Sequence, residues 1–122
     1  MQTAVAANIP AHMAGASARR ARLVCALAVA LAGAVYLNAL DNPFIYDDHR
    51  LIVDNPALRD LSDLRAILWR DIARPVVNLT YATDLAAWGP GPFGLHLTNV
   101  VLHMINVALV ALVAWRLAED MA

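Results

Sequence analysis

The stretch LVCALAVALAGAVYLNAL, residues 23–40, contains no charged side chain and decides the fold class. Its 18 residues would rise about 27 Å as an α-helix, which is close to the roughly 30 Å hydrocarbon core of a bilayer. Arg19, Arg20 and Arg22 stand directly before it. We therefore predict a transmembrane helix over residues 21–40. The alanine-rich residues 1–20 are predicted to be a disordered lead-in.

The same stretch has a competing interpretation as a secretory signal peptide. Basic residues precede a short apolar region, and Ala32-Gly33-Ala34 could serve as its cleavage site. The apolar run, however, continues past that site through Val35, Tyr36 and Leu37. This continuation favours the transmembrane helix.

A second apolar run, residues 95–115, contains no acidic residue, lysine or arginine, and its 21 residues are enough for a full span. Arg116 follows it. Arginines lie on the N-terminal side of the first span and on the C-terminal side of the second. The positive-inside rule therefore places both termini in the cytoplasm. We predict a helix at 95–115, a cytoplasmic tail at 116–122 and an external loop at 41–94. That loop would lie in the periplasm or lumen of a bacterial inner membrane or ER-type membrane.

The composition also indicates an integral membrane protein. Hydrophobic residues make up 61% of the 122 residues, against about 45–50% in soluble domains. Charged residues make up 16%, against about 25%. The net charge of −1 gives no reason to expect a nucleic-acid partner. Cys25 is the one cysteine, so neither an internal disulfide nor a cysteine metal site can form.

The loop has the pattern of short amphipathic helices. Asparagine, serine and proline stand where helices typically begin, and Gly89-Pro90-Gly91-Pro92 ends the last one. We expect these helices to lie on the membrane surface. The predicted fold is thus an all-α membrane fold, with two transmembrane helices joined by an external loop with short interfacial helices. The expected loop elements are a turn through Leu58 opened by the N-cap Asn55-Pro56, a helix from 63 to about 71 capped by Ser62, and a helix from Pro75 to about Trp88.

The aspartate pair Asp47-Asp48 lies a few residues beyond the first span and is the first candidate for catalysis. Two adjacent carboxylates can leave one group poised as a general base while the other binds a metal ion or orients an acceptor. The alternative is a pair of solvated loop aspartates that cap the next turn. These residues indicate no particular cofactor, although the pair could bind a divalent metal ion.

The second span has one polar stripe. His96, Asn99, His103 and Asn106 recur at i, i+3, i+7 and i+10 and so share one helix face. Such a stripe usually faces a bundle interior or a wet cavity, and it could hold neighbouring helices together. His96, at the external end, is a candidate donor to an anionic ligand. A metal site made by His96 and His103 is disfavoured, because seven residues separate them by about 10 Å along the axis.

Arg74-Pro75 is the third candidate. A guanidinium at the start of a helix, aided by the positive end of the helix dipole, suits a phosphate group. Lipid headgroups are the alternative partner. Asn78-Leu79-Thr80 also matches the N-glycosylation sequon in the external loop.

Six motifs follow one another along residues 35–115. They are Tyr36-Leu37-Asn38, the run from Phe44 to Asp48, Asn55-Pro56, the run from Arg74 to Tyr81, Trp88-Gly89, and the run from Phe93 to Asn106. In this order and spacing they resemble the N-terminal region of the O-mannosyltransferase-like membrane proteins that carry tetratricopeptide repeats. That family belongs to the GT-C class of membrane glycosyltransferases.

The resemblance implies a polyprenyl-phosphate-linked sugar as donor and a hydroxyl of a protein or glycan as acceptor. It implies inverting transfer on the external face, within membrane lipid. It also implies that the acidic pair lies at the active site, where Asp47 or Asp48 would act as the general base. We hypothesise that Arg74 or His96 stabilises the departing lipid phosphate.

Members of that family continue through many more transmembrane helices and a repeat domain, whereas this chain ends soon after its second span. We therefore expect a truncated piece that is inactive alone. The first alternative is a small structural or interaction protein that packs on partner helices through the polar stripe. The second alternative is a metal- or haem-binding membrane subunit that uses His96 and His103.

Overall fold

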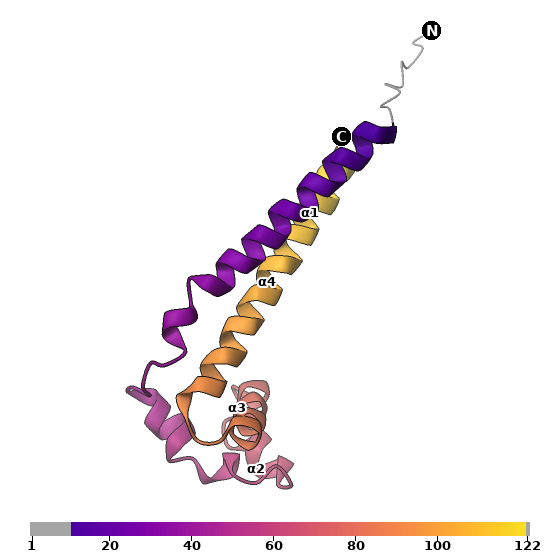
Figure 1. Cartoon of the computed structure of the whole chain (residues 1–122). Helices are drawn as coiled ribbons and strands as arrows, with labels where there is room; N and C mark the ends of the chain where they lie inside the picture. Colours follow the sequence, from indigo (N-terminus) through magenta and orange to yellow (C-terminus); the bar gives the residue numbers. More distant parts are fainter. Residues whose placement is uncertain (1–10, 122) are drawn as a thin grey trace.

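The computed structural model describes residues 11–121, which form helices and turns and contain no strand. Two long helices, α1 (Ala11–Ala34) and α4 (Pro92–Asp120), run antiparallel and pack on one another. Figure 1 shows the shorter elements gathered at the end of this pair where α4 begins. These elements are the 3₁₀ helices η1 (Leu37–Ala39) and η3 (Pro56–Leu58), the π-helix η2 (His49–Val53), and the α-helices α2 (Leu64–Trp69) and α3 (Pro75–Trp88).

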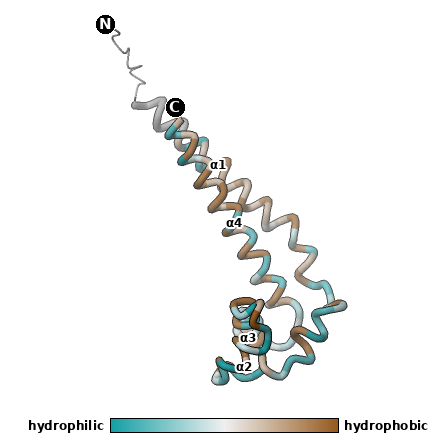
Figure 2. Tube along the Cα trace, turned by 180° about the vertical axis from the view of Figure 1, so that it is seen from behind, coloured by the Kyte–Doolittle hydropathy of each residue, from teal (hydrophilic) through white to brown (hydrophobic). Residues whose placement is uncertain are grey.

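Two segments are long and apolar enough to cross a bilayer. They are Ala18–Ala39, with a mean hydropathy of 1.7, and α4, with a mean hydropathy of 2.1. Only 6% of either apolar window is buried, and a soluble protein does not expose so much contiguous apolar surface. Figure 2 shows apolar residues along both long helices and more hydrophilic ones around the short elements. The chain is an all-helical membrane protein with two candidate spanning helices, as its sequence predicts.

The first long helix differs from the prediction at both ends. It begins at Ala11, within the predicted lead-in, because an alanine-rich segment has high helix propensity; residues 1–10 of that lead-in lie outside the described residues. It ends at Ala34, before the predicted limit of 40. From there the bonds tighten to the 3₁₀ type, with Ala39 N–H donating to the carbonyl of Tyr36 at 3.0 Å. Pro43 disfavours helix in Asn42, so a helix could not have continued through that residue.

The second long helix begins three residues earlier than the predicted 95–115 and extends beyond it. Pro92 occupies its first turn, where a proline costs no hydrogen bond. At its other end, α4 continues through Arg116 to Asp120, into the predicted tail at 116–122. Charged residues are compatible with helix propagation, so a change to polar sequence does not by itself end a helix.

Two of the three predicted loop elements are confirmed. Asn55 caps η3, its side-chain oxygen accepting from Ala57 N–H at 3.2 Å, and α3 extends from Pro75 to Trp88 as expected. The predicted cap of the remaining helix was wrong. The carboxylate of Asp63, and not Ser62, accepts from Ala66 N–H at 2.9 Å. The Ser62 hydroxyl is occupied, because it donates to the carboxylate of Asp60 at 2.6 Å.

The short helices pack on one another around a small core. Leu58 of η3, Ile67 of α2 and Ala82 of α3 are buried, with partly buried side chains packed against them. At the end of α3, the buried carboxylate of Asp84 accepts from the hydroxyl of Thr98 in α4 at 2.7 Å. The loop is therefore a folded subdomain attached to the membrane helices, and its position relative to the membrane surface stays a prediction.

Candidate functional site

The two adjacent aspartates take different directions. Tyr46, just before them, has a left-handed backbone with φ 46°, and a helical turn then leads into η2. The carboxylate of Asp48 turns back and accepts from Ile45 N–H at 3.0 Å. Asp47 instead lines a pocket. Asp48 thus bonds back to the turn that precedes it, whereas Asp47 contributes to the lining of a cavity.

The pocket beside Asp47 has a volume of about 230 Å³ and is mainly polar. It contains Arg74, the third sequence candidate, so the fold brings two of the four predicted site residues together. Asp48 and His96 do not line it. The complete lining is Asp47, Arg50, Leu51, Asn55, Arg70, Asp71, Arg74 and Asn78.

Local structure explains how these side chains meet. Asp47, Arg50 and Leu51 stand at i, i+3 and i+4, and residues with this spacing share one side of a helical turn. Arg70 is the C-cap of α2, and Arg74 is the N-cap of α3, four residues later. The pocket therefore lies where the turn after Tyr46 meets the connection between two helices.

Two buried asparagines hold the pocket in shape. Asn78 donates from its side-chain nitrogen to the carbonyl of Ile67 at 3.2 Å, which joins α3 to α2. Asn55 donates to the carbonyl of Leu51 at 3.0 Å. Both are almost completely buried, and buried amides that are satisfied in this way fix the surrounding backbone. The two hydrogen bonds thus fix the backbone segments that carry the charged residues of the pocket.

The pocket is electrostatically suited to an anion. Three arginines face two aspartates in its lining, which leaves an excess of one positive charge. Arg74 also stands at the N-terminal end of the 14-residue α3, where the helix dipole is positive. Guanidinium groups bind phosphate oxygens in a forked geometry. An anionic group held here would lie beside the carboxylate of Asp47, which can accept a proton.

Sequence reasoning missed Arg50, Arg70 and Asp71. Arg50 carried a signal, because it lies on the same helical side as Asp47. Arg70 and Asp71 fall in the connection between α2 and α3, and their approach to Asp47 depends on tertiary packing. No periodicity in the sequence reports that approach.

His96 and His103 of the polar stripe contact the segment that follows α1. The Nε2 atom of His96 lies 3.1 Å from the carbonyl oxygen of Asn42, a distance that fits a hydrogen bond donated by the ring. The ring of His103 packs edge-on against Tyr36, with ring centroids 5.2 Å apart. His96, Asn99 and His103 line a second cavity of about 250 Å³. The two histidines of the stripe thus make contacts within the chain, at a place separate from the Asp47 pocket.

The described residues contain no group of three or more histidine, cysteine, aspartate or glutamate side chains that could hold a metal ion. A divalent ion at Asp47 would need further ligands from a substrate or from water. The haem or metal alternative relies on His96 and His103, and both already contact the segment that follows α1.

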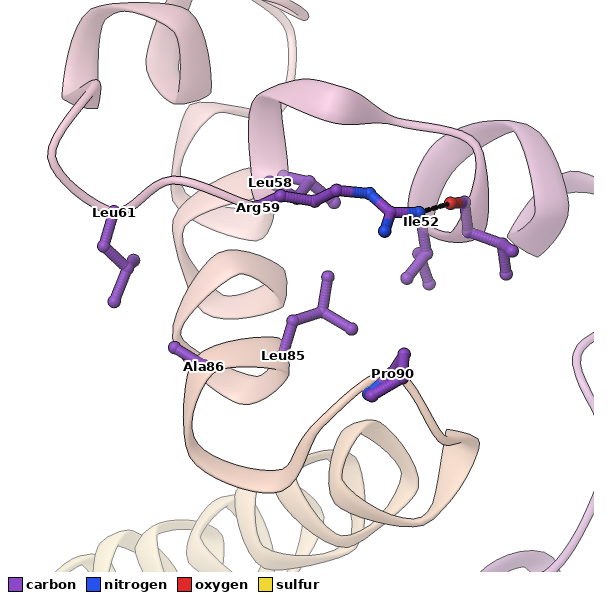
Figure 3. A pocket seen from close by; sticks show the side chains of 8 residues that line it. Ile52, Leu58, Arg59, Leu61, Leu85, Ala86 and Pro90 are labelled. Carbon is purple, nitrogen blue, oxygen red and sulfur yellow. Dashed lines mark hydrogen bonds between the residues drawn. The ribbon is translucent and has the colours of Figure 1, made fainter.

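A third cavity, of about 260 Å³, is mainly apolar (Figure 3). Ile52, Leu58 and Leu85 line it, and its charged residue, Arg59, donates to the carbonyl of Val53 at 2.7 Å. This hydrogen bond links the end of η3 to the end of η2. The cavity offers no carboxylate or imidazole for proton transfer, so the Asp47 pocket is the better candidate for chemistry.

The sequon at Asn78 is not accessible in this fold. Asn78 is 6% exposed, and its side-chain nitrogen is the atom that bonds Ile67. A glycan would have to be joined to that same nitrogen. Attachment of a sugar to this buried nitrogen would therefore disturb the packing of α3 on α2.

Comparison with curated proteins identifies O-mannosyl-transferases as relatives. The chain is 36% identical over 98 residues to protein O-mannosyl-transferase Tmtc1 of Drosophila melanogaster, covering 70% of this chain and 11% of that protein. It is 35% identical over 104 residues to Tmtc2 of the same organism, covering 74% and 11%. It is 33% identical over 87 residues to human TMTC2, covering 61% and 10%.

The chain spans about a tenth of the length of these curated relatives. No protein-family model matches it. No solved structure matches it either. The similarities support a relationship to the O-mannosyl-transferases.

Proposed function

We propose that this chain contains the catalytic base of a lipid-linked-sugar glycosyltransferase of the O-mannosyl-transferase type. The observation that carries the proposal is the pocket in which Asp47 lies with Arg74, Arg50 and Arg70. A base beside a cluster of guanidinium groups is what sugar transfer from a phosphate carrier requires. The similarity to the O-mannosyl-transferases supports the same class of reaction.

The reaction is an inverting displacement at the anomeric carbon of the donor sugar. The carboxylate of Asp47 takes the proton of the acceptor hydroxyl, and the oxygen of that hydroxyl forms a bond to the anomeric carbon. The bond between that carbon and the lipid phosphate breaks in the same step, and its electron pair leaves with the phosphate. Arg74, with Arg50 and Arg70, stabilises the negative charge that develops on the leaving group.

The donor is a polyprenyl-phosphate-linked sugar, mannose by analogy with the names of the relatives. The surroundings of the pocket support a lipid carrier. Ile72 and Val76 are each 71% exposed, and they follow the pocket residues Asp71 and Arg74 closely in the chain. Exposed apolar side chains beside a charged pocket suit a ligand with an apolar tail and an anionic head. The acceptor is a hydroxyl of a protein or glycan.

The chain contributes this site to a GT-C enzyme whose further membrane helices close the cavity around the donor. The site faces the periplasm or lumen, and both termini of the chain face the cytoplasm. Asp48 then supports the turn that positions Asp47. Arg74, from inside the pocket, is better placed for the phosphate than His96, which lies beside Asn42.

The proposal is tested in a chimera. Residues 21–120 replace the homologous segment of full-length Drosophila Tmtc1, and transfer of mannose from polyprenyl-phosphate mannose to a hydroxyl peptide is measured in membranes. We expect Asp47→Asn to reduce transfer by at least about a hundredfold, because a general base typically contributes that much or more. Arg74→Gln should reduce it by about tenfold or more, as expected for one charge-assisted contact to the leaving group.

Asp48→Asn is the matched control for the base. The amide keeps an oxygen that accepts from Ile45 N–H, so transfer should fall by less than about tenfold. His96→Gln is the control for the contact between Arg74 and the phosphate, because His96 lies outside the pocket. The proposal fails if Asp47→Asn leaves transfer intact, or if Asp48→Asn abolishes transfer while Asp47→Asn does not.

A second candidate function is a membrane interaction protein that packs on partner helices. The observation in its favour is that Asn99 and Asn106 are exposed on α4, whereas His96 and His103 make contacts within the chain. An exposed asparagine inside a span is costly unless another helix bonds it. If Asn106→Leu abolishes capture of a partner by the chain while Asp47→Asn does not, this function is favoured.

A further inference from the structure

We propose that the groove between α1 and α4 binds one anionic phospholipid, with its phosphate at Arg22 and an acyl chain along the helices. The groove lies far from the Asp47 pocket along the chain and is lined by different residues. It has a volume of about 500 Å³ and an almost entirely apolar wall. Its lining consists of Arg22, Cys25, Ala26, Val29, Ala30, Met104, Ala108, Leu112 and Trp115.

The groove exists because small side chains leave space between two helices that touch further along. On α1 the lining is mostly alanine, cysteine and valine. At its inner end the helices close together, since Gly33 is buried and a Cβ placed on it would lie 2.7 Å from the sulfur of Met104. Ala30 and Met104 therefore mark the closed end, and Arg22 and Trp115 mark the open end.

The length of the groove matches one leaflet. Its wall on α4 extends from Met104 to Trp115, which is about 16 Å at 1.5 Å per residue. Half of a roughly 30 Å hydrocarbon core is about 15 Å. A transmembrane helix as occupant would be expected to need a groove through the whole core. An acyl chain that enters from one headgroup layer needs only the half that is present.

The charge at the open end selects the headgroup. Arg22 lines the groove itself, while Arg19 and Arg20 precede it on the same helix and Arg116 follows Trp115. A tryptophan beside arginines at the end of a span marks the headgroup level. Basic pockets between transmembrane helices bind anionic lipid headgroups. The occupant that satisfies both the apolar wall and the cationic end is an anionic phospholipid of that leaflet.

The chain itself offers matched variants for a test. Arg22 lines the groove and Arg20 does not, although both are exposed arginines two positions apart in α1. Ala26 lines the groove and Ala28 does not, although both are exposed alanines. Arg22→Gln removes the charge, and Ala26→Leu fills the apolar wall without changing the charge. Arg20→Gln and Ala28→Leu are their controls.

The 122-residue chain is placed in nanodiscs made of equal parts phosphatidylcholine and phosphatidylglycerol, and retained lipid is counted by native mass spectrometry. We expect one phosphatidylglycerol retained by the parent chain and by both controls. Arg22→Gln should lower retention by about tenfold, the equivalent of one charge-assisted hydrogen bond. Ala26→Leu should lower it to a similar extent because the acyl chain loses its space.

Three results would overturn the proposal. An equal loss in Arg20→Gln and Arg22→Gln would mean general attraction of lipid to a basic helix end. Unchanged retention in Ala26→Leu would mean that the lipid lies outside the groove. A lipid-free dimer would mean that a second copy of the chain fills the groove instead.

Discussion

At the scale of single residues, the most informative one is Tyr46. Its backbone is left-handed, which is strained for a residue other than glycine. The residue is 92% exposed, so packing of its ring does not offset that backbone strain. Asp47 and Asp48 follow Tyr46 in one helical turn, where consecutive side chains point about 100° apart. Sequence could name the acidic pair, but it could not say which carboxylate caps Ile45 N–H and which lines the pocket. That distinction depends on how the turn packs against α2 and α3.

Asp60 gives a residue-scale prediction of pH dependence. The hydroxyl and the backbone N–H of Ser62 both donate to its carboxylate, and these bonds hold the pKa of Asp60 below its ordinary value. A depressed folded pKa means that the bonds stabilise the fold above the unfolded pKa of about 3.9. That stability is lost as the pH falls through the lower folded pKa.

Ser62→Ala removes the hydroxyl bond, which is the larger cause of the shift. We expect the pKa of Asp60 to rise towards its ordinary value in a carbon-13 NMR titration of the reconstituted chain. Ser62→Thr keeps the hydroxyl and should keep the low pKa. An identical titration curve in Ser62→Ala and the parent would show that the hydroxyl does not donate to Asp60.

At the scale of helices and turns, local chemistry accounts for most of the fold. Apolar length predicts both spans, and the caps at Asn55 and Pro75 predict η3 and α3. The cap of α2 was predicted wrongly because two residues could make it. Asp63 caps the helix, and the hydroxyl of Ser62 bonds Asp60 instead. The site was less predictable than the fold, because Arg70 meets Asp47 only through the packing of α2, α3 and the turn after Tyr46. Such a contact between distant segments leaves no pattern in a single sequence.

The corner between α3 and α4 gives a prediction for an element. A Cβ on Gly94 would overlap the Cβ of Trp88, which is fixed to the backbone of α3. We expect Gly94→Ala to destabilise the subdomain by about 1–3 kcal/mol, the usual cost of overpacking. The measurement is thermal unfolding by circular dichroism in one fixed detergent.

Gly33→Ala is the matched comparison. Its new Cβ would meet the sulfur of Met104 at 2.7 Å, and that side chain is flexible enough to move away. Its midpoint temperature should therefore fall by less than that of Gly94→Ala. Equal losses in the two variants would contradict the tighter packing at Trp88.

At the scale of the whole molecule, the chain has an apolar stem and a charged head. The antiparallel α1 and α4 bring the start of the first helix and the end of the second to one end of the stem, with the short elements at the other (Figures 1 and 2). Three arginines before the first span and one after the second then act together on orientation. The head is expected on the opposite side of the membrane from both termini.

This orientation can be measured by cysteine labelling in intact cells. In a Cys25→Ala background, Ile72→Cys should react with a membrane-impermeant maleimide from outside, because Ile72 is 71% exposed in the head. Val113→Cys, which is 57% exposed but lies within α4, should stay unlabelled because lipid covers it. Labelling of Ile72→Cys only after the cells are permeabilised would place the head in the cytoplasm.

The buried asparagine of the sequon has a consequence for biosynthesis. Once α3 has packed on α2, the amide nitrogen of Asn78 is bonded to Ile67 and closed to enzymes. In a eukaryotic secretory host, glycan attachment there would have to occur in the interval between emergence of the segment and completion of the head. The fraction of chains that carry the sugar would then depend on the rate of glycan attachment relative to the rate at which the head folds. Substitutions that slow assembly of the head would raise that fraction, so Asn78 would serve as a kinetic reporter of folding at the membrane.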